Sequence, residues 1–486
     1  MEWRRLGAAA LLVAVTALLI LSLGRTPPRP EAPPPVSPRL AVLPFTRVPG
    51  LESDPLRDGL MDDLIDGLAR RYPDRLSVVA RTSAMTRSGT GKPPREVGRE
   101  LGASHLLSGT IRQDADRTVV EARLLRAADE AEVWRQTLEV RSEEMPRLGP
   151  LLIDGVARAL GLGEGAPVPT FAGLTPRAFQ AFTEGRYLAR KGTPEDRQRA
   201  LALLQEAILL APDFAPAYIA CGWTRLDFSR PAGEVVPGAE AAARKALELD
   251  PRSGEARAIL ANIELFFRFD WRRARAELDQ ALALSPGDPE PHRVHAAYLA
   301  SQGHLDAALL AARRAQLLDP FSDVVQGDLA WYLFLDRRYG EALDATRQAL
   351  ALQPGDPWTR SFLIDAALAA GEPQTALAQA NSLLAGLQTR ALSPPPPVRV
   401  ETLRDFWQWQ VQRLETGAAR RPISPLASTI PLLHLGDQER VLRLLAEARR
   451  ARFGSGLVFL AVDPRFDPLH KRPEFQAILR SLGLAP

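Results

Sequence analysis

Leucines recur every four positions at Leu56, Leu60, Leu64 and Leu68, which predicts a helix with one buried apolar face. Asp54 and Pro55 precede this face, and they are typical of a helix start, since aspartate caps the amino end and proline needs no amide hydrogen there. Neighbouring stretches alternate apolar and polar residues, as half-buried strands do. Together these patterns predict a small α/β domain over residues 39–163.

The same patterns place the other elements of this domain. We expect strands at 40–45, 76–80 and 106–111, a hairpin that pairs 118–125 with 132–140, and helices at 94–101 and 143–160. Asp62, Asp63 and Asp66 lie mostly off the leucine stripe. Clustered carboxylates can bind a metal, but we interpret these three as a solvated helix face.

Prolines recur at the ends of amphipathic helices in the rest of the chain, at Pro212, Pro251, Pro286, Pro320 and Pro354. Alanines recur in phase with them, at 274, 308 and 342 and again at 281, 315 and 349. A helix–turn–helix period of about 34 residues is the signature of the tetratricopeptide repeat (TPR). We predict six TPR repeats over 175–388, an irregular helix with a degenerate seventh repeat over 389–452, and a C-terminal cap over 453–486.

Five segments of the α/β region look like the TolB-like amino-terminal domain of bacterial TPR proteins: 40–45, 58–64, 79–83, 96–102 and 107–111. The tail motifs at 462–469 and 473–479 resemble the cap of the same family. The resemblance implies a non-catalytic α/β module, which often follows a winged helix, a kinase or a nucleotide cyclase on the cytoplasmic side of a membrane helix. Residues 1–5 leave no room for such an output domain, so we expect neither DNA binding nor cyclase activity.

Residues 6–23 carry no charge and would span about 27 Å as a helix, close to the hydrocarbon core of a bilayer. We predict a transmembrane anchor after a short tail, 1–5, and before a proline-rich linker, 24–38. A cleaved signal peptide is the alternative, since 22–24 offers a small-x-small site. Arginines flank the run on both sides, so charge does not decide its orientation. The family resemblance and the anchor predict a bacterial cytoplasmic-membrane protein with its bulk outside the cytoplasm, or a secreted protein if the segment is cleaved.

Composition narrows the functions further. The net charge is only +3, and the arginines are scattered along amphipathic helices without the concentrated basic stripe that nucleic-acid binding needs. Cys221 is the only cysteine, so no intramolecular disulfide can form. Residues 164–174 read as a linker, because Gly and Pro are frequent around them. We therefore expect 39–163 and 175–486 to fold independently.

Motifs for catalysis are missing from the sequence. Gly89–Lys92 differs from a P-loop, since Thr86 and Pro93 stand where glycine and Ser or Thr are required. His292 and His295 fall at packing positions of a repeat helix, as does Cys221 in its own repeat. No protease, hydrolase, kinase or dinucleotide fingerprint is present. We predict a protein that is not an enzyme and has no metal or cofactor.

The first helix of each TPR repeat lines a concave groove, and transferring that phase along the chain gives candidate partner-binding residues: Arg186, Trp223, Phe266, Arg293, Trp331, Phe334 and Trp358. Aromatic residues and arginine are enriched at binding hot spots, although packing between helices is the alternative for each. For an open groove, Trp331→Ala and Arg293→Glu should leave melting nearly intact. The irregular region also holds Trp407 and Trp409, which the repeat phase does not place.

The main hypothesis is a membrane-anchored TPR scaffold that binds a protein or peptide partner outside the cytoplasm. The alternative is a sensory or regulatory subunit that passes a signal to a separately encoded output protein such as a kinase, a cyclase or a transcription regulator. A secreted catalyst with an unrecognised site is a third interpretation.

Overall fold

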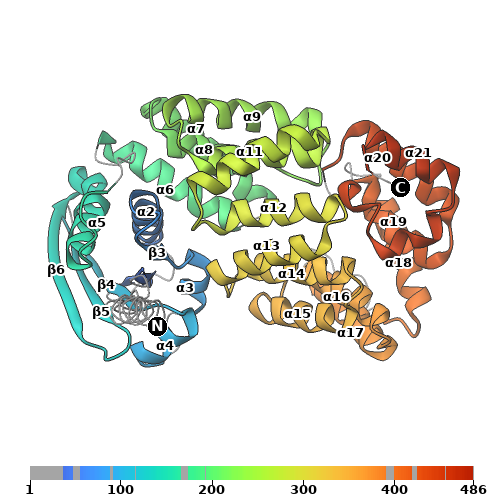
Figure 1. Ribbon diagram of the computed structural model, residues 1–486, viewed down its shortest axis with the longest axis horizontal. Coiled ribbons are helices and arrows are strands. Elements are labelled where there is room, and N and C mark those ends of the chain that lie inside the picture. Colours follow the sequence, from blue (N-terminus) through green and yellow to red (C-terminus); the bar gives the residue numbers. More distant parts are fainter. Residues whose placement is uncertain are drawn as a thin grey trace, which may run out of the picture. The chain divides into compact units, whose positions relative to one another are not determined.

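The computed structural model describes residues 37–47, 55–87, 91–114, 117–165, 173–191, 193–389, 399–418, 424–454 and 456–484. The predicted anchor, 6–23, lies outside these ranges. Within them, no helix is long and apolar enough to cross a membrane. The described chain combines a small N-terminal sheet with a mostly helical, TPR-like solenoid (Figure 1).

The sheet has the strand order β3-β1-β4-β5-β6, and β2 pairs with β4 outside this path. Its strands are β1 (Arg39–Val42), β2 (Thr46–Arg47), β3 (Ser77–Val78), β4 (His105–Asp114), β5 (Arg117–Arg126) and β6 (Glu132–Arg141). β1 is parallel to β3 and β4, whereas β4, β5 and β6 form an antiparallel meander. The expected hairpin is confirmed, because β5 pairs with β6 along its length.

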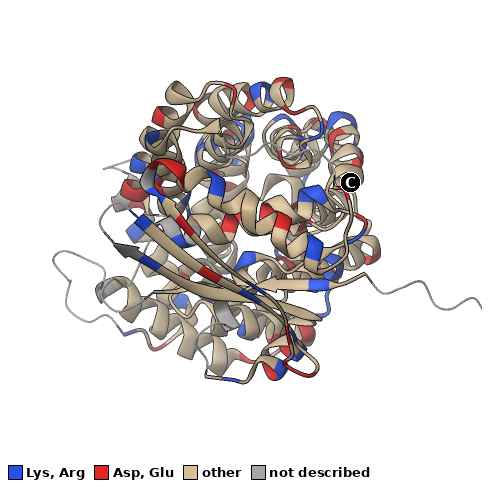
Figure 2. Ribbon diagram, turned by 90° about the vertical axis from the view of Figure 1, so that its left-hand side faces the viewer, with Lys and Arg blue, Asp and Glu red and all other residues tan. Residues whose placement is uncertain are grey.

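Helices cover both faces of the sheet. The side chains of Leu40 and Leu107 face the core under α2 (Pro55–Arg71) and α5 (Leu148–Ala159). Ala41 and Leu106 face the opposite way, toward α4 (Pro94–Leu101). This alternation follows from the two-residue period of a strand. Beyond α4, the outer face of β5 and β6 carries interspersed acidic and basic side chains (Figure 2).

Several element boundaries differ from the prediction. The expected strand 40–45 ends early, at Val42 of β1, and β2 begins only at Thr46. Pro44 lies between the two strands and has no amide hydrogen for a ladder. The expected helix 143–160 begins as a 3-10 helix, η1 (Ser142–Arg147), with Pro146 inside it, and continues as α5. A short helix, α3 (Arg81–Arg87), was not predicted at all.

Six consecutive helix pairs follow the sheet (Figure 1). They are α6 (Pro176–Lys191) with α7 (Pro194–Leu210), α8 (Ala215–Arg225) with α9 (Ala232–Leu249), α10 (Gly254–Asn262) and η3 (Ile263–Arg268) with α11 (Trp271–Leu284), α12 (Pro289–Ser301) with α13 (Leu305–Leu318), α14 (Asp323–Leu335) with α15 (Tyr339–Leu352), and α16 (Pro357–Ala369) with α17 (Pro373–Thr389). Four of the first helices, α10, α12, α14 and α16, start at side-chain caps: Ser253, Asp288, Ser322 and Asp356 each accept a hydrogen bond from a backbone amide.

The alanines that recur in phase are the contact points between these helices. Ala274, Ala308 and Ala342 have no exposed surface, and neither do Ala281, Ala315 and Ala349. A larger side chain at any of them would push two helices apart, because cores are packed without spare volume. The repeat period therefore fixes the spacing of the array.

The N-terminal end of the array packs against α2 of the sheet unit, and this contact corrects the prediction for the acidic residues. The side chains of Asp62 and Asp63 are buried rather than solvated. Asp62 accepts ion pairs from Arg81 (2.6 Å) and from Arg190 on α6 (2.7 Å). α6 covers the polar face of α2, so charges that look exposed on an isolated helix become an interface.

The two segments that we expected to fold independently share one core. Leu60 and Leu64 of α2 belong to the same buried cluster as Phe179 and Phe182 of α6. A second contact joins α3 to the turn between α13 and α14, where the Ser83 amide donates to Asp319 Oδ1 (3.1 Å) and the Phe321 amide donates to Ser83 Oγ (2.8 Å). The shared core argues against independent folding.

The C-terminal segment contains α18 (Leu403–Ala418), η4 (Pro425–Ser428), α19 (Thr429–Leu435), α20 (Gln438–Ala451), η5 (Leu457–Phe459), η6 (Pro464–Leu469) and α21 (Pro473–Ser481). It has a core of its own around Leu445, Leu469 and Phe475. It also does more than cap the last repeat. Phe459 belongs to the core of the array, so the segment folds back against the repeats.

Candidate partner-binding groove

A cavity of about 1210 Å³ opens on the inner side of the array. Its walls come from the first helices of successive repeats, α8, η3, α12, α14 and α16, and from the C-terminal segment. Ligand sites in proteins typically have volumes of this order or smaller. We call this cavity the groove.

The structure places five of the seven predicted residues along the groove: Trp223, Phe266, Arg293, Trp331 and Trp358. The other two lie elsewhere. Phe334 is only 2% exposed and packs in the core of the array. Arg186 donates to Asp66 (3.0 Å) at the junction with α2. Repeat phase places five of the seven residues on the helix face that lines the cavity, but it does not reveal which residues neighbouring elements cover.

One part of the groove, which we call the open half, is formed by Val324, Asp328 and Trp358. The side chains of Val324 and Trp358 are 48% and 56% exposed. Trp358 stacks on Phe362 with 5.7 Å between ring centroids, and its edge lies against α14 at Gly327, where no side chain intervenes. One face of the Trp358 ring therefore packs against Phe362, and the other remains accessible to solvent.

The other part, the covered half, is formed by Trp331 and Asp365 beneath the C-terminal segment. The ring of Phe459 meets Trp331 edge-on at 5.7 Å, and the Arg465 guanidinium lies 5.0 Å from the centroid of the Trp331 ring. Both are favourable aromatic geometries. Trp331 is therefore partly buried by the chain itself, which contradicts an open position for this ring.

An arginine shared between two carboxylates stands in the open half. Arg293 donates to Glu290 (2.6 Å) and to Asp328 (2.7 Å), which holds α12 against α14. Burial raises the pKa of the Asp328 carboxyl, and the Arg293 charge opposes part of that rise. Arg293→Glu would place three carboxylates together, so the expectation that this variant leaves melting intact no longer holds.

The covered half has a second shared arginine. Arg465 donates to Asp365 (2.7 Å) and to Asp463 (2.7 Å), and His434 Nε2 lies 3.3 Å from the other oxygen of Asp365. Burial alone would raise the pKa of Asp365, but its contacts with His434 and Arg465 hold that pKa below its ordinary value. Trp407 stacks on the His434 ring at 4.4 Å, which gives this tryptophan the place that the sequence did not.

Sequence reasoning missed Phe459 and Arg465, which lie more than 90 residues after the repeats that they cover. The motif 462–469 was identified as part of a cap; Arg465 lies inside this motif, and Phe459 lies three residues before it. Nothing in a linear pattern tells which repeat such a segment reaches. Both residues contact positions that are far away from them in the sequence.

The other candidates for chemistry are structural. His292 Nε2 lies 3.0 Å from the Pro286 carbonyl, and Cys221 is buried with its sulfur 3.3 Å from Arg225 Nε. Within the described ranges, no three histidine, cysteine or acidic residues converge as metal ligands would. Lys92 forms an ion pair with Glu96 (2.9 Å) and another with Glu100, so its ammonium is already engaged.

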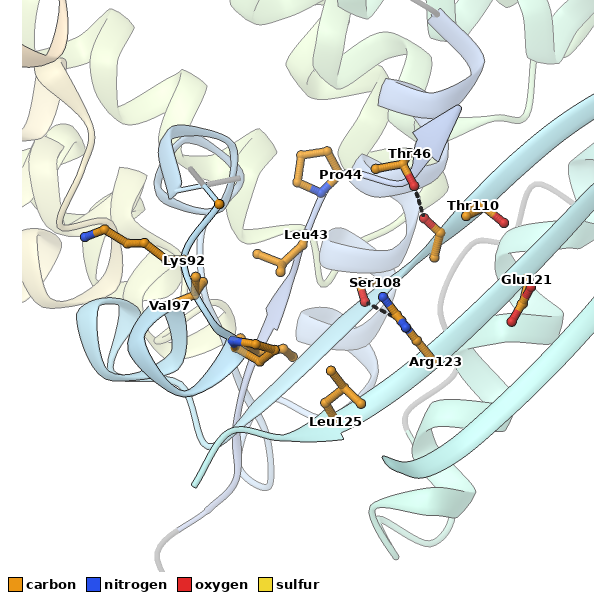
Figure 3. A pocket seen from close by; sticks show the side chains of 14 residues that line it. Leu43, Pro44, Thr46, Lys92, Val97, Ser108, Thr110, Glu121, Arg123 and Leu125 are labelled. Atoms are coloured by element: carbon orange, nitrogen blue, oxygen red, sulfur yellow. Dashed lines mark hydrogen bonds between the residues drawn. The ribbon is translucent and has the colours of Figure 1, made fainter. Parts of the chain in front are cut away.

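A smaller cavity of about 410 Å³ lies on the sheet between α4, β4 and β5 (Figure 3). Leu43, Val97 and Leu125 form its apolar part. Arg123 Nε donates to Ser108 Oγ at 3.4 Å, a long and weak hydrogen bond. We assign this cavity no role.

Comparisons with known proteins find a family model and a curated protein that each match part of this chain. A family model for the second domain of HilA/YgeH-like transcriptional regulators matches residues 37–151, which cover the sheet and the start of α5. A protein of Rhizobium meliloti (strain 1021) named "Putative adenylate cyclase 3" is 25% identical over 203 residues, 40% of this chain and 34% of that protein. The chain thus spans about a third of the curated relative that it matches.

Similar solved structures include a thermophilic TPR protein of Thermus thermophilus, at 21% identity over 39% of this chain and 99% of that chain, with a TM-score of 0.35. TolB from Acinetobacter baumannii is 19% identical over 26% of this chain and 29% of that chain, with a TM-score of 0.22. Scores this low carry no inference. The TolB-like resemblance of the sheet unit is not confirmed, and the TPR-like assignment rests on the 34-residue period and the paired helices.

Proposed function

We propose that the chain is a non-enzymatic scaffold whose groove holds an extended segment of a partner protein. The observation that carries this proposal is the open half of the groove, where Trp358 and Val324 are about half exposed beside a cavity of about 1210 Å³. Tryptophan is among the commonest anchors of protein interfaces. A solenoid presents such residues along one continuous surface, on which a segment can lie across several repeats.

The charges of the lining indicate the chemistry of that segment. Four carboxylates line the groove and only two arginines, an excess of two negative charges: Glu290, Asp328, Asp365 and Asp463 against Arg293 and Arg465. A lysine or arginine of the partner would be attracted both to this excess and to the face of the Trp358 ring. We infer a partner segment in which a basic residue stands next to large apolar ones.

Selection from a random peptide library on the immobilised full-length protein tests this proposal. Enriched peptides should pair lysine or arginine with large apolar residues, and Trp358→Ala should weaken their binding at least tenfold. Leu310→Ala is the matched control, since Leu310 lies on α13 outside the groove and is 71% exposed. Its peptide affinities should equal those of the wild type.

Three outcomes would count against the proposal in different ways. If the library yields no binders, the groove is not a peptide site. If binders are acidic or neutral, the groove function stands and the inferred basic partner is wrong. Equal losses in Trp358→Ala and Leu310→Ala would move the site away from the groove.

We also propose that residues 6–23 anchor the chain in a bacterial cytoplasmic membrane and that the rest lies outside the cytoplasm. The uncharged 18-residue run supports this placement. Protease added to cells with the outer barrier opened should digest the large domains while cytoplasmic marker proteins survive. Release of the intact protein into the medium would instead favour signal cleavage and secretion.

A second candidate function is a sensory or regulatory subunit with a TolB-like sheet unit. The Ser83 contact with Asp319 and Phe321 favours it, because this turn leads directly into α14, which carries Val324 and Asp328. The similar proteins named above as a transcriptional regulator and an adenylate cyclase are output proteins of the kind such a subunit would serve. Ser83→Ala should change peptide affinity in the groove if the sheet unit controls it, and should leave that affinity unchanged if it does not.

A further inference from the structure

A second cavity, of about 440 Å³, lies at the seam between the third helix pair and the C-terminal segment. Four arginines line it, with two aromatic side chains: Arg268, Arg449, Arg450 and Arg452, then Phe269 and Trp271. Among the residues that the structure describes, no acidic one lines it. We call it the arginine pocket. It is separate from the groove, since the two share no lining residue.

Three of these arginines have no ion-pair partner among the described residues. Arg268 is already satisfied, because Glu240 and Glu264 accept its hydrogen bonds. Arg449, Arg450 and Arg452 have none. Other described arginines, such as Arg275 and Arg337, do pair with carboxylates, even at the exposed surface. Three unpaired guanidinium groups around one cavity repel each other, and an anion bound between them would relieve that repulsion.

The backbone around the arginine pocket is unusual as well. Four described residues other than glycine have positive φ angles, and two of them, Phe269 (57°) and Arg452 (53°), line this pocket. The helix η3, which ends at Arg268, is a π-helix. Strained residues and π-helical turns cluster at functional sites, because the strain is kept where it positions a side chain.

Stabilisation of helix ends is the simplest alternative. η3, α20 and α21 all end at this pocket, and cations are favourable near helix C-termini. Two of the end carbonyls of α20 are, however, already occupied, since the Arg452 amide donates to Arg449 O (3.1 Å) and the Phe453 amide to Ala448 O (3.0 Å). Capping therefore explains the arginine positions along α20 but not their convergence with Phe269 and Trp271.

We propose that the arginine pocket binds the phosphate groups of a small organic phosphate, with the organic part against Trp271. Guanidinium groups match phosphate oxygens in pairs, which makes arginine the preferred residue for this chemistry. Trp271 Nε1 donates to the Leu482 carbonyl (3.0 Å), which fixes the ring as part of the wall. The volume suits a ligand of nucleotide size rather than a macromolecule. Free pyrophosphate and a nucleoside phosphate share this chemistry.

Calorimetric titration of the purified full-length protein at low salt tests the proposal with three probes. ATP and pyrophosphate should bind and raise the melting temperature, because a ligand of the folded state stabilises it, and adenosine should do neither. Tighter binding of ATP than of pyrophosphate would mean that the organic part of ATP, next to Trp271, contributes to the affinity. Equal binding would mean that the pocket reads phosphate alone. Both results support a phosphate site.

Two variants make the test specific. Arg449→Ala should weaken ATP binding at least tenfold, since charge-assisted hydrogen bonds are lost. Arg452→Gly should weaken it similarly while the unliganded protein melts at a higher temperature, because glycine adopts the positive φ without strain. Arg443→Ala on the same helix is the control, since Arg443 is exposed and does not line the pocket.

Three results would overturn the proposal. They are no binding of either phosphate compound at millimolar concentration, binding that survives both Arg449→Ala and Arg452→Gly, or an equal loss in Arg443→Ala. The last result would reduce the interaction to general attraction by surface charge.

Discussion

The open and covered halves of the groove each contain a tryptophan from the first helix of a repeat, yet the surroundings of the two rings differ. Trp358 keeps 56% of its surface exposed, whereas Trp331 lies under Phe459 and the Arg465 guanidinium. Trp358 is the second residue of α16, whereas Trp331 is the ninth residue of α14. The difference in exposure comes from the C-terminal segment, which covers Trp331 and leaves Trp358 accessible to a partner.

The largest loss of stability is expected when the arginine that pairs with Asp365 and Asp463 in the covered half is removed. Arg465→Ala leaves Asp365 and Asp463 without their shared partner, and breaking a buried ion pair costs about 3–5 kcal/mol. Urea unfolding of the full-length protein measures this loss. Arg337→Ala is the control, because the Arg337–Asp467 pair is exposed and should contribute less than about 1 kcal/mol.

Trp331→Ala is the next largest test. Removing a ring that packs against Phe334, Phe362 and Phe459 should cost about 3 kcal/mol. This expectation replaces the one drawn from sequence, which placed Trp331 in an open groove. An unfolding midpoint equal to that of the wild type would mean that the C-terminal segment does not cover this ring in solution.

The dependence of stability on pH should have opposite directions in the two halves, because the pKa values of Asp365 and Asp328 are shifted in opposite directions. Asp365 has a lowered pKa, so its charge stabilises the fold above its ordinary value of 3.8, and this contribution disappears as pH falls through the folded pKa. Asp328 has a raised pKa, so its contribution is lost as pH rises from 3.8 through the folded pKa.

Unfolding free energies of two asparagine variants, measured from pH 3 to pH 7, test these signs. Asp365→Asn should be clearly destabilised at pH 7 and approach the wild type in acid. At pH 7, Asp328→Asn should lose less unfolding free energy than Asp365→Asn. Its loss relative to the wild type should be largest in acid. The same direction for both variants would mean that the two carboxylates have similar environments.

Trp358→Ala should have the smallest effect on stability, about 0.5–1 kcal/mol, because half of the ring is already in water. The melting temperature of Trp358→Ala should be compared with that of Leu310→Ala, which also truncates an exposed apolar side chain. A loss as large as that of Trp331→Ala would show that Trp358 is a packing residue and would remove the main support for a binding role.

The fold could be predicted to the extent that it depends on local patterns. Ala308 and Ala342 recur with the repeat period because each contacts its own helix pair, so a linear pattern reveals them. Asp62 could not be placed in this way. The helix pattern of α2 leaves it on a polar face, and only the arrival of α6, more than 100 residues later, buries it beside Arg190.

The sites follow the same rule. Repeat phase identified Trp358 and Arg293, but the cover of Trp331 and the arginine pocket depend on segments far apart in the chain. The cluster Arg449, Arg450 and Arg452 is visible in the sequence as a short basic run at a helix end. Its meeting with Arg268 and Trp271, some 180 residues earlier, requires the closed seam that only the folded chain contains.

Site-specific photo-cross-linking in cells tests the central claim most directly. A photoreactive residue in place of Val324 stands beside Trp358 in the open half, and one in place of Leu310 stands outside the groove. The groove function predicts that position 324 cross-links to one partner, through a segment with lysine or arginine beside large apolar residues, and that position 310 does not. No cross-link at 324, or the same products from both positions, would contradict a partner-binding groove.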